Sequence, residues 1–178
     1  DGLGWRGGEG SQISGPKFDL KFELAVLDEL GGPGRCEVHV FDHRAALEPG
    51  LLPSQLPHGL IVHPWSIEGD HDRLKGRRTH LTLSETLEKL GHKGRTIDLF
   101  KVDCESCEWT QYADWLNVDA DLKQILVELH GTPRLATNIF EMLRVAGYVI
   151  FHKEVDVQYG GMWVEYGFLK LHQDFFDK

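Results

Sequence analysis

Three carboxylates follow a mainly apolar segment near the middle of the sequence. The segment spans residues 97–102, and Asp103, Glu105 and Glu108 come after it at spacings of two and three residues. A buried strand that ends in acids places negative charge at the carboxyl edge of a sheet, which is where open α/β folds bind their ligands. The pattern therefore predicts a ligand site at this strand end.

Two other predicted strands also end in groups that could contact a ligand. Asp42 follows a short β-branched strand, and Glu128 and His130 lie at the end of a second apolar strand. In a parallel sheet these strand ends meet at one edge, so we expect the side chains to lie near Asp103. A carboxylate beyond the second strand suits hydrogen bonds to ribose hydroxyls, which predicts that Asp42 binds a ribose. A cap of the turn at residues 42–44 is the alternative.

Asp103, Glu128 and His130 offer ligand types that a divalent metal ion uses. Hydrogen bonding of the same three side chains to a substrate is the interpretation that we favour. We therefore predict no metal site and keep a divalent ion at these residues as the less favoured alternative.

Cys104 and Cys107 form a C-x-x-C pair, which is typical of redox and zinc sites. The neighbouring acids Asp103, Glu105 and Glu108 disfavour a thiolate, and no second pair of metal ligands follows at zinc-site spacing. Packing of both cysteines as small apolar side chains is favoured, and a bond between the two remains open.

Gly2, Gly4 and Gly7 have the G-x-G-x-x-G spacing of a dinucleotide-binding turn. That motif needs a strand before it and a helix directly after it, whereas residues 1–17 have the composition of a loop. We therefore predict a flexible loop near a cofactor, with the first strand of the sheet upstream of residue 1. Trp65 follows another strand, where its ring could cover a purine or act as a buried anchor.

The hydrophobic pattern predicts alternating strands and helices. Such alternation indicates βαβ units and a mostly parallel sheet, and the two adjacent final strands add an antiparallel edge. The expected fold is one doubly wound α/β domain over residues 1–178, with Ser84 as the N-cap of its second helix. The predicted helices are 18–30, 85–90, one from about 107, and 132–146, and the strands are 37–41, 60–62, 97–102, 124–129, 148–152 and 164–171.

The net charge, the apolar runs and the cysteine count limit the kinds of partner and environment expected for this chain. The net charge is −9, from 19 basic and 28 acidic residues among 178, which argues against a nucleic-acid backbone as the main partner. No run of 18 apolar residues is present, so no membrane span is predicted. Three cysteines cannot all pair, which argues against a disulfide framework.

Residues 97–109, IDLFKVDCESCEW, resemble the I-D-L-x-K-x-D-x-E-G-x-E segment of FkbM-type S-adenosylmethionine-dependent methyltransferases. Residues 36–42 (CEVHVFD), 125–130 (ILVELH) and 164–168 (VEYGF) resemble other segments of that family in the same order. One departure is Ser106, which occupies the position of the family's glycine.

The resemblance implies a Rossmann-like methyltransferase that transfers a methyl group from S-adenosylmethionine to an oxygen, or less often a nitrogen. A small-molecule or glycan-like acceptor follows from it. The implied roles are Asp42 for the ribose, Gly2 and Gly4 for the methionine moiety, Trp65 for the purine, Asp103 beside the sulfonium, and Glu105, Glu128 and His130 on the acceptor side. His130 is then the candidate base, and Lys101 is expected to pair with one of the acids.

Two other functions fit parts of the pattern. A nicotinamide-dependent oxidoreductase shares the fold but needs a compact glycine turn and a catalytic set that the sequence does not supply. A methyltransferase-fold binding domain without activity fits the serine at position 106 and the irregular glycine segment.

Overall fold

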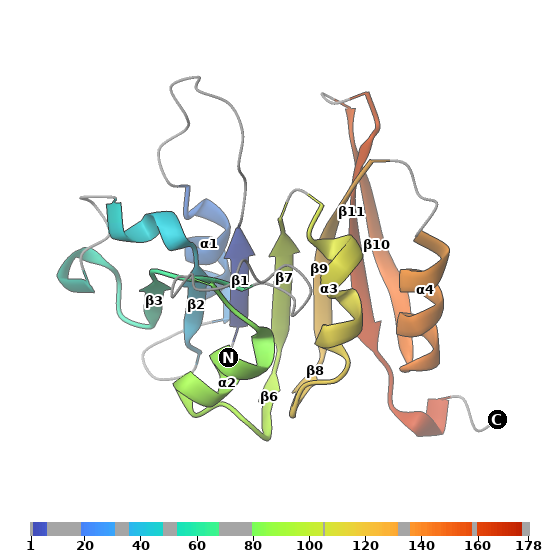
Figure 1. Ribbon diagram of the computed structural model, residues 1–178, viewed down its shortest axis with the longest axis horizontal. Coiled ribbons are helices and arrows are strands. Elements are labelled where there is room, and N and C mark those ends of the chain that lie inside the picture. Colours follow the sequence, from blue (N-terminus) through green and yellow to red (C-terminus); the bar gives the residue numbers. More distant parts are fainter. Residues whose placement is uncertain are drawn as a thin grey trace.

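The computed structural model describes residues 2–6, 19–30, 36–47, 53–67, 80–104, 106–131, 136–157 and 160–175. Within them, a seven-stranded sheet has the strand order β10-β11-β9-β7-β1-β2-β3. Figure 1 shows these strands side by side, with α4 near β10 and α1 near β2. The strands of this sheet are β1 (Gly2–Arg6), β2 (Val38–Phe41), β3 (Leu60–His63), β7 (Leu99–Asp103), β9 (Gln124–His130), β10 (Tyr148–Asp156) and β11 (Trp163–Lys170).

Helices and two small sheets surround the large one. The small sheets pair β4 (Ser66–Ile67) with β5 (His80–Leu81) and β6 (Arg95–Ile97) with β8 (Ala120–Leu122). The helices are α1 (Lys21–Leu30), α2 (Leu83–Leu90), α3 (Glu108–Trp115) and α4 (Ala136–Val145). None of these helices has both the length and the apolar character that crossing a membrane requires.

The architecture is a Rossmann-like α/β fold. Strands β3, β2, β1, β7 and β9 run parallel, and β11 is antiparallel to both β9 and β10. The prediction of one doubly wound sheet with an antiparallel edge strand was therefore too simple. The antiparallel strand lies inside the sheet, because β11 folds back from β10 and inserts between β10 and β9, and two small sheets stand beside the large one.

Apolar side chains form a core on each face of the large sheet. On one face, residues of α2, α3 and α4, such as Leu87, Trp115 and Ile139, share a buried cluster with residues of β7 and β9. On the other face, α1 packs near Val38 and Val40 of β2. Each side chain of this size stabilises the fold by about 1.5–3 kcal/mol when fully buried, so the two cores hold the strand ends in fixed positions.

Strand β1 corrects the prediction of a loop over residues 1–17. Gly2 pairs with Val38 of β2 and with Leu99 of β7, and Arg6 pairs with Asp103. The strand therefore occupies the central place that we expected for a strand upstream of residue 1. Glycines lower strand propensity and hide the pattern, whereas β1 is held by backbone hydrogen bonds to a neighbour on each side.

Local features also change two predicted boundaries, and a third cannot be compared. The strand predicted over 97–102 is divided, since Ile97 belongs to β6 and Leu99 begins β7. Ser84 is not the N-cap of α2, because Thr82 caps that helix through a capping box with Glu85. Helix α4 begins at Ala136, and the predicted start at Thr132 lies outside the described residues.

Candidate active site

The candidate site lies at the carboxyl edge of the large sheet. Asp103 ends β7, His130 ends β9, and Asp42 directly follows β2. Strand β1 lies between β2 and β7. The strands β2 and β3 continue the sheet on one side of β1, and β7 and β9 continue it on the other, so the strand order reverses here. Open α/β sheets bind ligands at such a switch point, beyond the carboxyl ends of the strands.

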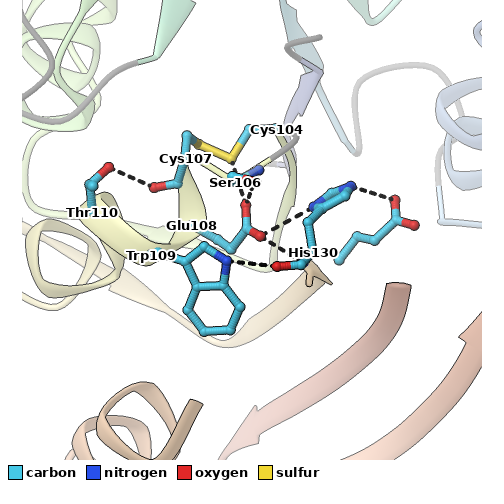
Figure 2. The surroundings of a disulfide bond; sticks show 8 residues. Cys104, Ser106, Cys107, Glu108, Trp109, Thr110 and His130 are labelled. Carbon is cyan, nitrogen blue, oxygen red and sulfur yellow. Dashed lines mark hydrogen bonds and ion pairs between the residues drawn. A yellow bond between two sulfur atoms is a disulfide. The ribbon is translucent and has the colours of Figure 1, made fainter. Parts of the chain in front are cut away.

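Glu108 and His130 form a buried pair at this edge (Figure 2). Oε1 of Glu108 accepts the backbone N–H of His130 at 2.7 Å and lies 3.2 Å from Nδ1 of the same histidine. Oε2 accepts the backbone N–H of Ser106 at 2.9 Å, and the indole of Trp109 donates to the His130 carbonyl at 2.9 Å. The first turn of α3 thus holds both the ring and the backbone of His130.

Asp103, Glu128 and His130 come together as predicted from their strand ends. One polar atom from each lies within 4.8 Å of the others, and Oε2 of Glu128 is 4.0 Å from Nε2 of His130. Nζ of Lys101 lies 3.7 Å from Asp103, so the lysine pairs with one of these acids as expected. Asp42 stands apart from this group, on the other side of β1.

The environment raises the pKa values of two of these groups, Glu128 and His130. Burial is the main cause that raises the pKa of Glu128 to about 7, and the negative charge of Asp103 and a hydrogen bond with it add to the effect. Burial by itself would lower the pKa of His130, but the hydrogen bond and charge of Glu108, with the charges of Glu128 and Asp103, raise it above its usual value. Groups with such pKa values can exchange a proton with a ligand near neutrality.

Cys104 and Cys107 are bonded to each other in a disulfide, which Figure 2 shows beside Glu108. The sequence left this bond open and favoured apolar packing of both cysteines, and Cys104 does lie in the buried core with Cys107 packed against it. The neighbouring acids disfavour a thiolate but do not oppose an uncharged disulfide. Ser106, inside this loop, has a φ of 94°, a backbone conformation that favours glycine. The predicted site residue Glu105 lies outside the described residues.

Asp42 is buried, and its carboxylate forms an ion pair and hydrogen bonds with Arg44. The guanidinium lies 2.7 Å from Oδ2, and the backbone N–H of Arg44 donates to Oδ1 at 2.8 Å. The second contact is the turn cap that the sequence left as an alternative. The side chain of Arg44 is about half exposed (48%).

Trp65 and the two glycines lie differently from their predicted roles. Trp65 is 8% exposed, and Nζ of Lys89 lies 3.9 Å from the centre of its ring, as in the buried-anchor alternative. Gly2 begins β1, roughly 13 Å before the strand ends at Arg6, so it lies far from the carboxyl edge. Gly4 lies in the middle of that strand.

Two cavities border Glu128. The first has a volume of about 330 Å³ and lies between α1 and the sheet, with Phe22 and Lys101 in its lining. The second has a volume of about 310 Å³ and is lined by Glu154 and Glu165 among other residues. A ligand in either cavity would therefore contact Glu128, which lies beside Asp103 and His130.

Glu108 is a residue of the candidate site to which sequence reasoning gave no role. It was counted among the acids after the strand, but no role was assigned to it. The available signal was its position at the start of a helix, three residues after Glu105. That signal does not reveal the partner, because His130 is 22 residues further along the chain.

One solved structure among the matches is the 16S rRNA methylase ArmA, at 11% sequence identity and a TM-score of 0.44. The similarity covers 96% of this chain and 74% of that chain. We withdraw the prediction that excluded nucleic acid as a partner, because a negative net charge summed over a whole chain does not exclude an acceptor of that class. No curated protein matches the sequence.

A family model described as a methyltransferase domain matches residues 13–170. The match includes β2, β3, β7, β9, β10 and β11 and therefore the strand ends that carry Asp42, Asp103, Glu128 and His130. The chain belongs to this methyltransferase domain family.

Proposed function

We propose that the chain transfers a methyl group from S-adenosylmethionine to a hydroxyl oxygen, with His130 as the general base. The observation that carries this proposal is the buried Glu108–His130 pair at the carboxyl edge of the sheet. A hydroxyl is a weak nucleophile until its proton is removed, and a positioned histidine is the side chain most often used for that step.

Glu108 supports the assignment of the base by orienting His130. A carboxylate next to Nδ1 favours the proton on that nitrogen, which leaves Nε2 free to accept a proton. Nε2 is the atom that lies toward Glu128, beside the two cavities. In the proposed reaction Nε2 takes the hydroxyl proton, and the Glu108 carboxylate stabilises the imidazolium that forms.

The residues around the switch point fit the cofactor. Asp42 would accept hydrogen bonds from the ribose hydroxyls once the Arg44 side chain turns away. The Asp103 carboxylate would lie beside the positively charged sulfur of the cofactor. Bound at this edge, S-adenosylmethionine would supply a methyl group on a cationic sulfur. Gly2, Gly4 and Trp65 are not part of the proposal, because of where they lie in the strand and the core.

Calorimetric titration with S-adenosylmethionine and S-adenosylhomocysteine tests the cofactor. We expect both to bind, and the variant Asp42→Asn to bind at least tenfold more weakly, since it loses the charge that accepts two ribose hydroxyls. Asp121→Asn is the matched control, because Asp121 is also held by cations, Lys123 and Lys170, but lies on β8 away from the site. Failure of both ligands to bind would support the inactive binding domain instead.

A second experiment tests the acceptor atom and the base. The chain is incubated with cell extract and S-adenosylmethionine that carries a ¹³C-methyl group, and NMR then distinguishes O-methyl from N-methyl products by chemical shift. We expect O-methyl signals, and a loss of about 10²–10⁴-fold in rate for His130→Asn, with the exposed His172→Asn as control. Products with only N-methyl groups would contradict the hydroxyl assignment.

The variant Glu108→Gln tests whether Glu108 positions His130 and raises its pKa, or only stabilises the fold. The substitution removes the charge and hydrogen bond that raise the pKa of His130 and leaves burial, which lowers it. The rising limb of the pH–rate profile should therefore move to lower pH, together with a lower maximal rate. Glu141→Gln, which removes an exposed carboxylate paired with Arg144, should leave the profile unchanged.

A further inference from the structure

A second polar cluster lies away from the carboxyl edge, around the beginning of β2. Glu37 directly precedes the strand, His39 is its second residue, and His92 follows α2. His39 is separated from Asp42 by three residues of extended chain, roughly 10 Å, so this cluster is not part of the proposed methyl-transfer site.

The three side chains present their ligand atoms to one another. One atom each from Glu37, His39 and His92 lies within 4.8 Å of the others, and Oε2 of Glu37 is 3.5 Å from Nε2 of His39. Ligands at 2.0–2.1 Å in a tetrahedral zinc site stand about 3.4 Å apart, so the carboxylate–imidazole spacing already suits one ion. Both histidines are buried, at 3% and 5% exposure, while Glu37 is half exposed.

A buried atom without a partner points into this cluster. Nδ1 of His39 is 2.9 Å from Nε2 of His63, whereas Nε2 of His39 has no hydrogen-bond partner among the described residues. With the proton on Nδ1, Nε2 of His39 is left with a bare lone pair, and Oε2 of Glu37, 3.5 Å away, has no proton to donate to it. Leaving a buried polar atom unpaired is unfavourable, and a cation bound to its lone pair removes that cost.

His63 supplies the outer support that metal-bound histidines commonly have. With Nε2 of His39 bound to an ion, its proton must lie on Nδ1, which then donates to Nε2 of His63. The His63 and His39 rings are nearly parallel, with an interplanar angle of 7°, as the hydrogen bond between them requires, so His63 holds the orientation of His39.

We propose that Glu37, His39 and His92 form a binding site for Zn²⁺, with water in the remaining position. Two imidazole nitrogens and one carboxylate oxygen form a donor set that suits zinc, whereas Mg²⁺ and Ca²⁺ prefer sites made of oxygen atoms. The ion joins the beginning of β2 to the loop after α2, two segments that are more than 50 residues apart in the sequence. Zinc binding is therefore expected to stabilise the domain, because it holds these two segments together.

Calorimetric titration of the chelator-treated chain with ZnCl₂ tests this site. We expect a dissociation constant in the micromolar range or below, a higher melting temperature with zinc, and no comparable effect of MgCl₂. Glu37→Gln and His92→Gln should each weaken zinc binding at least tenfold. His58→Gln removes an exposed histidine and should leave it within twofold of the original value.

Two further measurements make the assignment specific. His130→Gln should leave zinc affinity unchanged, because Asp103, Glu128 and His130 form a separate group of ligand types. The visible absorption of bound Co²⁺ should disappear in His92→Gln and persist in His130→Gln. The proposal is overturned if zinc does not bind, or if its affinity survives Glu37→Gln and His92→Gln but is lost in His130→Gln. Glu37→Gln changes an exposed side chain, so it carries the test even if His92→Gln does not fold.

Discussion

Glu108 has no exposed area, yet it carries a carboxylate at the start of a helix. A buried charge is costly unless it is hydrogen-bonded, and Glu108 accepts backbone N–H groups from Ser106 and His130. The same carboxylate lies against Nδ1 of His130 and helps to raise its pKa. One residue therefore ties the turn after β7, the start of α3 and the candidate base together.

Ser106 is the second position where a single residue decides the local geometry. Its backbone N–H must point to Glu108, and the φ of 94° that achieves this is strained for a residue with a Cβ atom. This gives a physical reason for glycine at the corresponding position of the FkbM-type segment that the sequence resembles.

Ser106→Gly is expected to stabilise the domain by about 1 kcal/mol. Relief of a strained φ gains about 1–3 kcal/mol, and the greater freedom of glycine in the unfolded chain offsets part of it. Urea unfolding with the disulfide intact measures the change. Ser106→Ala keeps the Cβ atom and should show no gain, so equal stability of the two variants would argue against strain at this position.

Among the elements, α2 shows how a short helix is fixed at both ends. Thr82 accepts the N–H of Glu85 at 3.1 Å, Glu85 accepts the N–H of Thr82 at 2.9 Å, and Gly91 ends the helix with a φ of 68°. Leu83 and Leu87 are buried in the core beside β7, so these caps position the helix whose following loop carries His92.

Thr82→Ala is expected to destabilise the domain by about 1 kcal/mol, because the first turn of α2 loses the side chain that satisfies a backbone N–H. Ser84→Ala is the matched control, since Ser84 is exposed within the helix and forms no part of the cap. Thermal or urea unfolding of the two variants distinguishes the structural assignment from the N-cap predicted by sequence. A larger loss for Ser84→Ala would reverse that assignment.

For the whole molecule, the raised pKa values at the site make stability depend on pH. The pKa of Glu128 is raised from 4.5 to about 7, so the folded state binds a proton that the unfolded state has lost between these values. That contribution is fully present below pH 4.5 and is lost as the pH rises through about 7. His130 acts in the same direction, because its raised pKa adds stability that is lost above its usual value of 6.5.

We therefore expect Glu128→Gln to gain stability relative to the unmodified chain as the pH rises from 5 to 8. The relative gain is on the order of 1–3 kcal/mol, because a change of one pKa unit corresponds to about 1.4 kcal/mol. Urea unfolding at pH 5, 6, 7 and 8 measures it, with the exposed Glu154→Gln as control. A difference that stays constant over this range would contradict the raised pKa of Glu128.

Much of the fold could be predicted because its strands are apolar, β-branched and bounded by clear breaks. The strands predicted over 37–41, 60–62 and 124–129 are present as β2, β3 and β9. Strand β1 could not be predicted, since its stability comes from two neighbours rather than from its own glycine-containing sequence. The interior place of β11 was missed for a related reason, because strand order depends on packing between elements.

For the site, the sequence by itself determined which strands end in acids and that Asp103, Glu128 and His130 would meet at one edge. Those positions follow from the alternation of strands and helices, which is a local property of the chain. Only the tertiary structure decided that Glu108 is hydrogen-bonded to His130, that Arg44 pairs with the carboxylate of Asp42, and that Cys104 and Cys107 form a disulfide. Each of these depends on side-chain direction and distance, which leave no periodic signal in the sequence. The contact of Glu108 with His130 also depends on the packing of α3 against β9, because the two residues are 22 positions apart.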